Sequence, residues 1–267
     1  MLPPYPVSRI TLAGLLLGAT TAFAQQSHLP EVQVRGPKDA SIGVADSASE
    51  GAVERESFQS RPKLRPGDIV EAVPGVVATQ HSGDGKANQY FLRGFNLDHG
   101  TDFAVTVDGM PVNMPSHGHG QGFADLNFLI PDLVSGVRYR KGPYFADGGD
   151  FSLAGSATLD YFGVLPAPFA EFTLGANNFR RLLAAGSRTR DDQTWLGAIE
   201  LEGNDGPWDV AERLRKFNAV VRFSQGSPVR GFNLTGMAYR NRWNSTDQVP
   251  QRLIDNGELS RLSLIHI

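Results

Sequence analysis

The chain has 267 residues and a formal net charge of −3, with 30 glycines, 17 prolines and no cysteine. A slightly negative charge gives no general attraction to nucleic acid. The absence of cysteine excludes disulfide frameworks, thiolate metal sites and cysteine nucleophiles. The many glycines and prolines favour short strands joined by turns over long helices.

The first 24 residues have the pattern of a cleaved signal peptide. Arg9 supplies a positive charge, residues 10–20 form a short apolar run, and Ala22-Phe23-Ala24 is a small-x-small cleavage site. A membrane-spanning helix needs about 20 apolar residues, which is more than this run supplies. No later stretch is apolar enough for such a helix either, so any later membrane insertion has to use strands.

Residues 25–50 are polar and rich in small residues, and they predict a flexible leader. Within this leader, residues 29–36 read LPEVQVRG, where Val32 and Val34 alternate with polar residues. Such a segment can add as a strand to the edge of another protein's sheet. An ordinary first strand or a disordered tail is the alternative.

Residues 51–163 predict a small α+β domain of short elements. A short helix is expected to begin at Asp68 with Glu71 as its capping-box partner, and Pro74-Gly75 ends it. A second short helix is expected to open at Pro131. The predicted strands, separated by glycine-rich turns, begin at Val76 and cover 91–94, 103–108 and the alternating residues around Val137.

Residues 164–261 change to a period-two pattern. Apolar residues form one face, and polar or charged residues the other, in 170–174, 195–202, 217–224 and 232–239, with 177–190 as a weaker fifth candidate. This alternation is typical of a membrane β-barrel with a wet interior. A soluble sandwich alternates too, but its core would have to bury charges such as that of Glu200.

Four or five strands cannot close a barrel around a domain of this size, because plugged barrels have about 22 strands. We therefore expect the chain to be the front part of a longer protein. Residues 262–267 do not continue the strand pattern, and we expect them to be a non-native tail.

The segments LPEVQVRG, DIVEAVPGV, FLRGF, VTVDGMPV and VRYRKGPYFADGG follow the signal peptide in the order and spacing of TonB-dependent outer-membrane receptors. The chain resembles this family from about Leu29 to Tyr239. The resemblance implies an α+β plug domain followed by the first strands of a large antiparallel transmembrane β-barrel.

The function that the resemblance implies is active import across the Gram-negative outer membrane. The ligand would be a metal or metal chelate (siderophore, haem, zinc or copper). TonB would supply the energy together with the inner-membrane ExbB/ExbD complex, and outer-membrane lipid would surround the barrel. No resident cofactor is expected. The alternatives are a passive barrel or adhesin without energy coupling, and a secreted soluble enzyme. No nucleophile elbow, HExxH motif or P-loop points to an enzyme.

The resemblance also assigns residues. Glu31, Val32, Gln33 and Val34 look like the TonB box, and the plug turns are Arg93-Gly94, Asp108-Gly109 and Gly142-Pro143. The family topology places His99 near the periplasmic end. It makes five residues in two plug loops face a ligand, namely His81, Ser82, Asn113, His117 and His119.

The segment His117-Gly118-His119-Gly120 puts two imidazoles close together on a flexible backbone. Imidazole is the commonest neutral metal ligand in proteins. With His81, the pair could give three nitrogen donors for zinc, copper or haem iron. The alternative is that the histidines only hydrogen-bond the ligand or the barrel wall. Asp84 and Lys86 are expected to be solvated loop charges.

Overall fold

The computed structural model describes residues 44–47, 49–62, 65–80, 82–227, 229–246 and 249–260, which all belong to one compact unit of residues 37–267. The predicted signal peptide, the TonB box, His81 and the tail of 262–267 lie outside the described residues. Among the described residues, no helix combines the length and the apolar character that a membrane crossing would need.

The predicted plug contains two sheets. One has six strands in the order β1-β2-β8-β9-β6-β7, and the other has three in the order β3-β4-β5. All neighbours are antiparallel except β6 and β9, which run parallel. The strands are β1 (Val44–Ser47), β2 (Glu50–Glu54), β3 (Val76–Thr79), β4 (Gln89–Leu92), β5 (Phe95–Asn96), β6 (Phe103–Val107), β7 (Met110–Pro111), β8 (Val134–Lys141) and β9 (Gly155–Tyr161).

Alternate side chains of β6 and β9 form the centre of the plug core. Phe103, Val105 and Val107 of β6 are fully buried, and Leu159 of β9 lies in the same core. Period-two burial follows from the pleat of a strand, which sends successive side chains to opposite faces. The same cluster contains Tyr90 of β4 and, between β7 and β8, Leu126, Leu129, Ile130 and Leu133.

Two of the three predicted plug turns have a left-handed backbone at both residues. Arg93 and Gly94 have φ values of 53° and 83°, and Asp108 and Gly109 have 50° and 79°. Hairpins of this tight kind need positive φ at both central residues, which is why glycine follows arginine or aspartate here. Asp108 also has a tertiary role, since its carboxylate accepts a hydrogen bond from the backbone N–H of Tyr161 at 3.0 Å.

The two predicted short helices are present as η2 (Pro66–Ala72) and η3 (Pro131–Leu133), but they are 3₁₀ rather than α, so the α+β class holds with little helix. The described residues also contain η1 (Arg55–Ser57), η4 (Ala146–Gly148) and one α-helix, α1 (Gln251–Asp255). The predicted capping box was wrong. η2 begins at Pro66, Asp68 binds Arg65 at 2.9 Å, and the Glu71 carboxylate accepts the backbone N–H of Ala78 at 2.9 Å.

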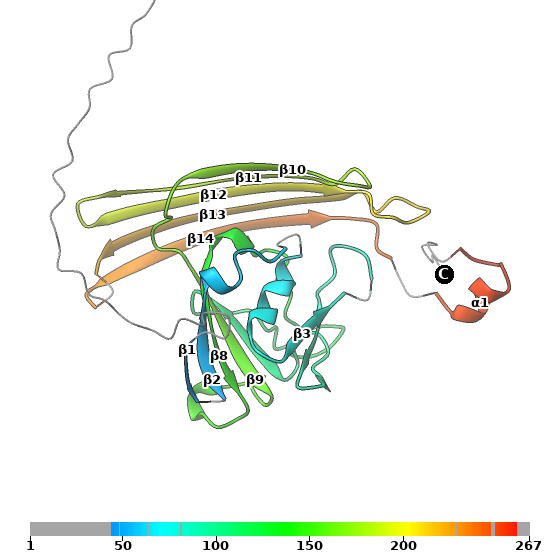
Figure 1. Ribbon diagram of the computed structural model, residues 1–267, viewed down its shortest axis with the longest axis horizontal. Helices are drawn as coiled ribbons and strands as arrows, with labels where there is room; N and C mark the ends of the chain where they lie inside the picture. Colours follow the sequence, from blue (N-terminus) through cyan, green and yellow to red (C-terminus); the bar gives the residue numbers. More distant parts are fainter. Residues whose placement is uncertain are drawn as a thin grey trace, which may run out of the picture. The chain divides into compact units, whose positions relative to one another are not determined.

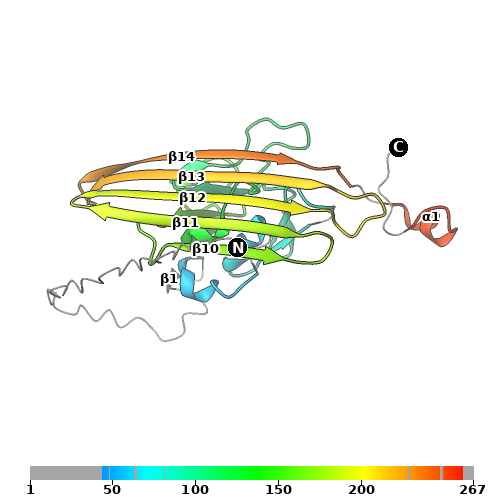
Figure 2. The same ribbon diagram turned by 90° about the horizontal axis from the view of Figure 1, so that it is seen from above.

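The five predicted period-two segments are confirmed as one antiparallel meander, which we call the wall sheet. Its strands are β10 (Phe169–Leu174), β11 (Arg180–Arg190), β12 (Gln193–Asn204), β13 (Leu214–Gly226) and β14 (Gly231–Arg242). Figures 1 and 2 show these strands side by side in chain order. The wall sheet is open within the described residues, because β10 and β14 each have only one neighbour.

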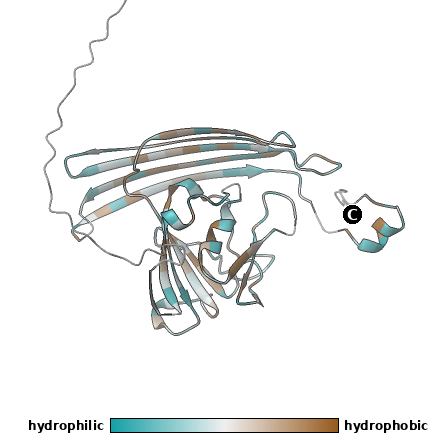
Figure 3. Cartoon of the chain, viewed as in Figure 1, coloured by the Kyte–Doolittle hydropathy of each residue, from teal (hydrophilic) through white to brown (hydrophobic). Residues whose placement is uncertain are grey.

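The wall sheet exposes its apolar face and covers its charged face, which is the opposite of the arrangement in a soluble protein. Hydrophilic and hydrophobic residues alternate along its strands in Figure 3. On β12, Trp195 is 56% exposed and Ile199 is 42% exposed, whereas Glu200 between their rows is 1% exposed. An apolar outer face with a polar inner face is the arrangement of a membrane barrel. The covered face is the charged one, which argues against the soluble sandwich.

Candidate functional site

Three loops of the plug meet at the same end of its strands. The chain reverses after β3, at the Arg93-Gly94 turn, after β5 and at the Asp108-Gly109 turn. The segments 80–88, 97–101 and 112–123 therefore meet opposite the turns. Hydrogen bonds hold them together: Asn88 O lies 2.9 Å from His99 Nδ1, Ala124 N–H donates to His99 O at 2.7 Å, and the Thr101 hydroxyl donates to Gln121 O at 3.0 Å.

Two histidines and one aspartate converge in this loop cluster. The Nε2 atom of His99 lies 3.7 Å from Asp98 Oδ1, and the Nε2 atom of His119 lies 3.6 Å from the same oxygen. The two imidazole rings meet edge to face with centroids 4.5 Å apart. One potential metal-ligating atom from each residue lies within 4.8 Å of the others. We call Asp98, His99 and His119 the histidine cluster.

The hydrogen bond between His99 and Asn88 O orients the His99 ring. A carbonyl oxygen only accepts, so Nδ1 carries the proton in this bond, and Nε2 is the nitrogen that a metal would take. That nitrogen is the one directed to Asp98. Metal-binding histidines commonly donate their other ring N–H to a carbonyl in this way, which orients the ring. One imidazole of the cluster, that of His99, is therefore held in a fixed orientation by the plug.

The burial of the cluster leaves it accessible from one side. The His99 side chain is 6% exposed, whereas the side chains of Asp98 and His119 are 46% and 50% exposed. Ligands about 2.0–2.2 Å from a tetrahedral metal are about 3.3 Å apart. The separations of 3.6 and 3.7 Å are near that value. The two imidazoles lie within 4.8 Å of each other, so the half-exposed His119 ring would have to move toward His99 to complete a tetrahedral set.

His117 has a different place from the one expected. Its ring stacks on Phe123 at 3.9 Å between centroids, and its Nδ1 accepts the backbone N–H of His119 at 3.2 Å. It therefore supports the loop beside the cluster. The prediction that His99 lies apart from the histidine loop was wrong, because the two-residue strand β5 returns the chain to the loop end before His99.

Asn113 does not face a ligand, contrary to expectation. Its side chain is buried, donates to Gly100 O, Phe103 O and Gly122 O at 2.9 Å each, and accepts the backbone N–H of Val105 at 2.7 Å. Its amide nitrogen and its amide oxygen are thus both engaged inside the plug. Ser82 is half-buried beside Gly83.

Asp84 and Lys86 are also not the solvated charges that were predicted. Asp84 accepts a hydrogen bond from Asn204 at the end of β12, and the Lys86 ammonium donates to Thr246 O at 2.8 Å. The plug loop of 82–88 is thereby attached to two wall segments, the end of β12 and the segment after β14.

A buried ion network forms a second attachment between the plug and the wall sheet. Arg181 of β11 contacts Asp132 of η3 at 2.6 Å and Glu200 of β12 at 2.7 Å. Lys216 of β13 contacts Glu200 at 3.5 Å and Glu202 at 2.5 Å. Near the Asp108-Gly109 turn, Arg222 binds Asp108 at 2.9 Å. Sequence analysis missed these pairs, although charges at inner-face positions of predicted strands signal that they need partners.

Glu212, in the β12–β13 loop of 205–213, is a buried titratable group where the plug loop of 82–88 meets the wall. The residue is 1% exposed; its carboxyl accepts the Trp208 indole N–H at 2.7 Å and lies 3.4 Å from the backbone nitrogen of Asp84. Burial raises the pKa of Glu212 to about 7, the Asp84 carboxylate adds to the rise, and the Trp208 hydrogen bond acts in the opposite direction.

We expect this attachment to weaken as pH rises. The carboxyl ionises at its ordinary value of 4.5 in the unfolded state and at about 7 when folded. Its contribution is therefore complete below about pH 4.5 and is lost as pH rises through about 7. Hydrogen exchange at Gly83 and Asp84, corrected for the intrinsic pH dependence of exchange, should show falling protection over this range. Glu212→Gln should remove the dependence, and a dependence that persists in this variant would assign it to another group.

Comparison with known proteins identifies the class. Residues 43–156 match the family described as TonB-dependent Receptor Plug Domain. Residues 43–156 are thus a TonB-dependent receptor plug domain, and the antiparallel wall strands follow it in the chain.

Solved receptors have the same fold at low identity. The chain is 16% identical to the copper transporter OprC with a TM-score of 0.56, over 75% of this chain and 32% of OprC. It is 14% identical to the FrpB iron transporter of Neisseria meningitidis with a TM-score of 0.55, over 72% of this chain and 31% of FrpB. It is 17% identical to a mutant of the ferric enterobactin receptor PfeA of Pseudomonas aeruginosa with a TM-score of 0.55, over 73% of this chain and 33% of PfeA. The chain thus spans about a third of the length of these receptors.

Proposed function

We propose that this chain is the plug and the first wall segment of an outer-membrane importer that TonB energises, and that the imported ligand contains a metal ion. The observation that carries the metal assignment is the convergence of His99 Nε2, His119 Nε2 and Asp98 Oδ1 at the loop end of the plug. TonB would capture the segment from Glu31 to Val34 by strand addition.

The lengths of the wall connections support an orientation. Residues 205–213 form a long connection, whereas Asp191 and Asp192 alone join β11 to β12. Outer-membrane barrels have short periplasmic turns and longer extracellular loops. The attachments of Asp84 and Lys86 to the long-loop end then put the histidine cluster on the extracellular side. A metal arriving from outside would meet it first.

The donor set favours a borderline divalent cation, bound directly or within a chelate. Two imidazole nitrogens and one carboxylate oxygen suit zinc, copper or ferrous iron, and no soft sulfur donor is part of the cluster. The names of the solved relatives support metal cargo in general, since they describe a copper transporter, an iron transporter and a ferric enterobactin receptor.

We expect that replacing both His99 and His119 by alanine weakens metal binding at least about 100-fold, because each lost imidazole removes one ligand of a three-ligand site. The measurement is titration of Zn²⁺ and of Cu²⁺ into the purified receptor that carries this segment with its remaining strands. Asp98→Asn, which keeps the shape but removes the charge, should weaken binding by a smaller factor. His28→Ala removes a leader imidazole and should change nothing.

Unchanged affinity for both metals in the double alanine variant would contradict the metal assignment while leaving energy-coupled import of another ligand in place. A passive barrel or adhesin remains the alternative function, and it differs in needing no TonB box. Deletion of the leader segment from Glu31 to Val34 therefore distinguishes the energy-coupled importer from the passive barrel or adhesin, whereas substitution of the histidines does not.

A further inference from the structure

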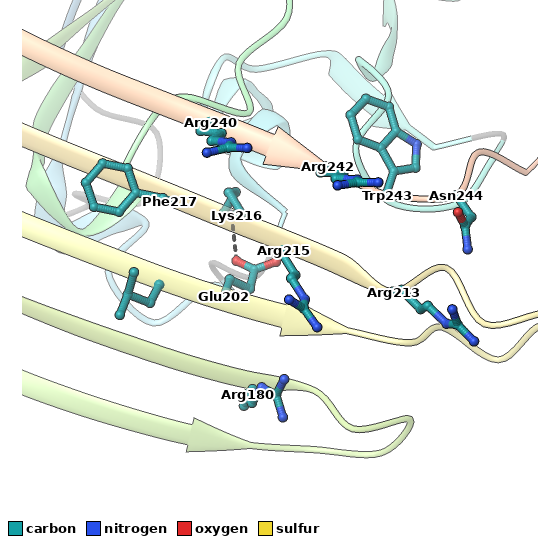
Figure 4. Close-up of a pocket in the computed structure, with 11 residues that line it drawn as sticks. Arg180, Glu202, Arg213, Arg215, Lys216, Phe217, Arg240, Arg242, Trp243 and Asn244 are labelled. Carbon is teal, nitrogen blue, oxygen red and sulfur yellow. Dashed lines mark ion pairs between the residues drawn. The ribbon is translucent and has the colours of Figure 1, made fainter.

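Five arginines gather on the outer face of the wall sheet at its long-loop end. Arg180, Arg213, Arg215, Arg240 and Arg242 line a groove of about 890 Å³ together with Leu201 and Phe217. Figure 4 shows them projecting from neighbouring strands and from the segment before β13. All five are exposed, whereas Arg181 and Lys216, their neighbours in sequence, lie buried on the inner face.

The strand register aligns three of these arginines in one row. Arg180, Gly203, Arg215 and Arg242 lie opposite one another across β11, β12, β13 and β14. Gly203 has no side chain, and the Arg180 side chain lies over it: a Cβ atom at Gly203 would lie 3.0 Å from Arg180 Nε. We call the groove with its five arginines the arginine cradle.

The charges of this cradle have no internal counter-ion among the described residues. Each cation of the buried ion network, namely Arg181, Lys216 and Arg222, has a carboxylate partner within 3.6 Å. None of the five outer arginines lies within ion-pair distance of a described carboxylate. The two acidic residues nearby are engaged elsewhere, since Glu202 binds Lys216 and Asp205 accepts a hydrogen bond from Asn178 at 2.7 Å.

The cradle lies at one edge of an apolar band. On the same outer face, Phe217, Val221 and Phe223 follow Arg215 along β13, and Trp195 packs against Phe223 at 4.8 Å. Arg215 and Phe223 are about 27 Å apart along the strand. With the usual barrel tilt of about 40° this is about 20 Å along the membrane normal, close to the height of a lipid-facing band that ends in aromatic residues.

We propose that this arginine cradle binds the phosphate groups of an outer-leaflet glycolipid, lipopolysaccharide. The proposal rests on the orientation inferred for the proposed function. Guanidinium binds phosphate bidentately, and its apolar stem can lie on Leu201 and Phe217 while the charge reaches the headgroup level. Like charges so close together repel unless an anion joins them. A headgroup with more than one phosphate satisfies several arginines of the row together.

The test measures lipid binding by the delipidated full receptor in detergent. The probes are purified lipopolysaccharide and the same lipid after phosphatase treatment, and inorganic phosphate serves as competitor. Arg215→Gln combined with Arg242→Gln should lower lipopolysaccharide affinity at least about tenfold, because it removes two charge-assisted contacts. Arg188→Gln is the matched control. Arg188 is also exposed on the outer face but lies opposite Trp195 at the aromatic edge, so its variant should bind like the unchanged receptor.

Three results would overturn the proposal: equal binding by the double glutamine variant, equal binding of the dephosphorylated lipid, or displacement of the lipid by millimolar inorganic phosphate, which would make the cradle a site for free anions. Zn²⁺ affinity of the double variant serves as the check on folding. Failure of the proposed import function would appear separately, as a receptor that does not fractionate with outer membranes or does not bind metal.

Discussion

Deletion of residues Glu31 to Val34 is expected to reduce uptake by the complete receptor to background while leaving metal binding unchanged. The four residues carry the alternating valines of the predicted TonB box. Strand addition depends on backbone hydrogen bonds, which a deleted segment cannot supply. The histidine cluster belongs to a different part of the chain, so binding should persist.

The control for this deletion is removal of an equally long leader segment, residues 38–41. That change shortens the leader by the same amount but keeps the box. A finer test is Val32→Pro, because proline cannot donate a ladder hydrogen bond. Uptake that survives removal of Glu31 to Val34 would favour the passive barrel and would reject energy coupling through this segment.

Arg181→Met is expected to destabilise the attachment of the plug to the wall by about 3–5 kcal/mol. The Arg181, Asp132 and Glu200 side chains are 2%, 4% and 1% exposed, so removal of the guanidinium leaves carboxylates buried with too little positive charge. Among the described residues, the carboxylates that pair with Lys216 are Glu200 and Glu202, so Lys216 does not replace the bond of Arg181 to Asp132. Hydrogen exchange across η3 and thermal unfolding of the receptor in detergent measure the loss.

The matched control is Arg190→Met, which breaks the exposed pair of Arg190 with Asp191. Those side chains are 89% and 88% exposed, and such pairs contribute about 0–1 kcal/mol. Equal effects of the two variants would show that the buried network does not hold the plug. A large effect of Arg181→Met alone fits a plug attached by a few strong polar contacts, which energy from TonB could break.

The wall strands were predictable because their signal is local. Alternation of Trp195 and Ile199 with Glu200 is visible within one strand and needs no knowledge of the neighbours. The Asp108-Gly109 turn has a local signal too, since aspartate and glycine both accept positive φ, whereas the Arg93-Gly94 turn was expected from the resemblance to the receptor family.

The contents of the site were less predictable because they depend on distant pairings. The strand β5 has only two residues, too few for a periodic signal, and missing it put His99 at the opposite end from His119. Asn113 looked like a loop residue, but its four backbone contacts appear only after the loops close around it. The bond of Lys86 to Thr246 joins residues that no local pattern connects.

The charged residues of the wall sheet were also hard to assign from the sequence. Inner charges such as Arg181 are matched by carboxylates from other strands and from the plug, whereas the outer arginines of the row with Arg215 have no described carboxylate within ion-pair distance. A sequence shows both sets only as arginines in strands. Only the strand register shows which of these arginines lie on the inner face and which lie on the outer face.

The most direct test of metal import through the histidine cluster is the initial rate of Zn²⁺ and Cu²⁺ uptake at concentrations below saturation, in cells whose only route is this receptor. Intact receptor should take up at least one of the two metals, and the variant with both His99 and His119 changed to alanine should fall to the level of the variant that lacks Glu31 to Val34. Equal uptake by the double alanine variant and the intact receptor would contradict the assignment of the cluster as the site of the imported metal.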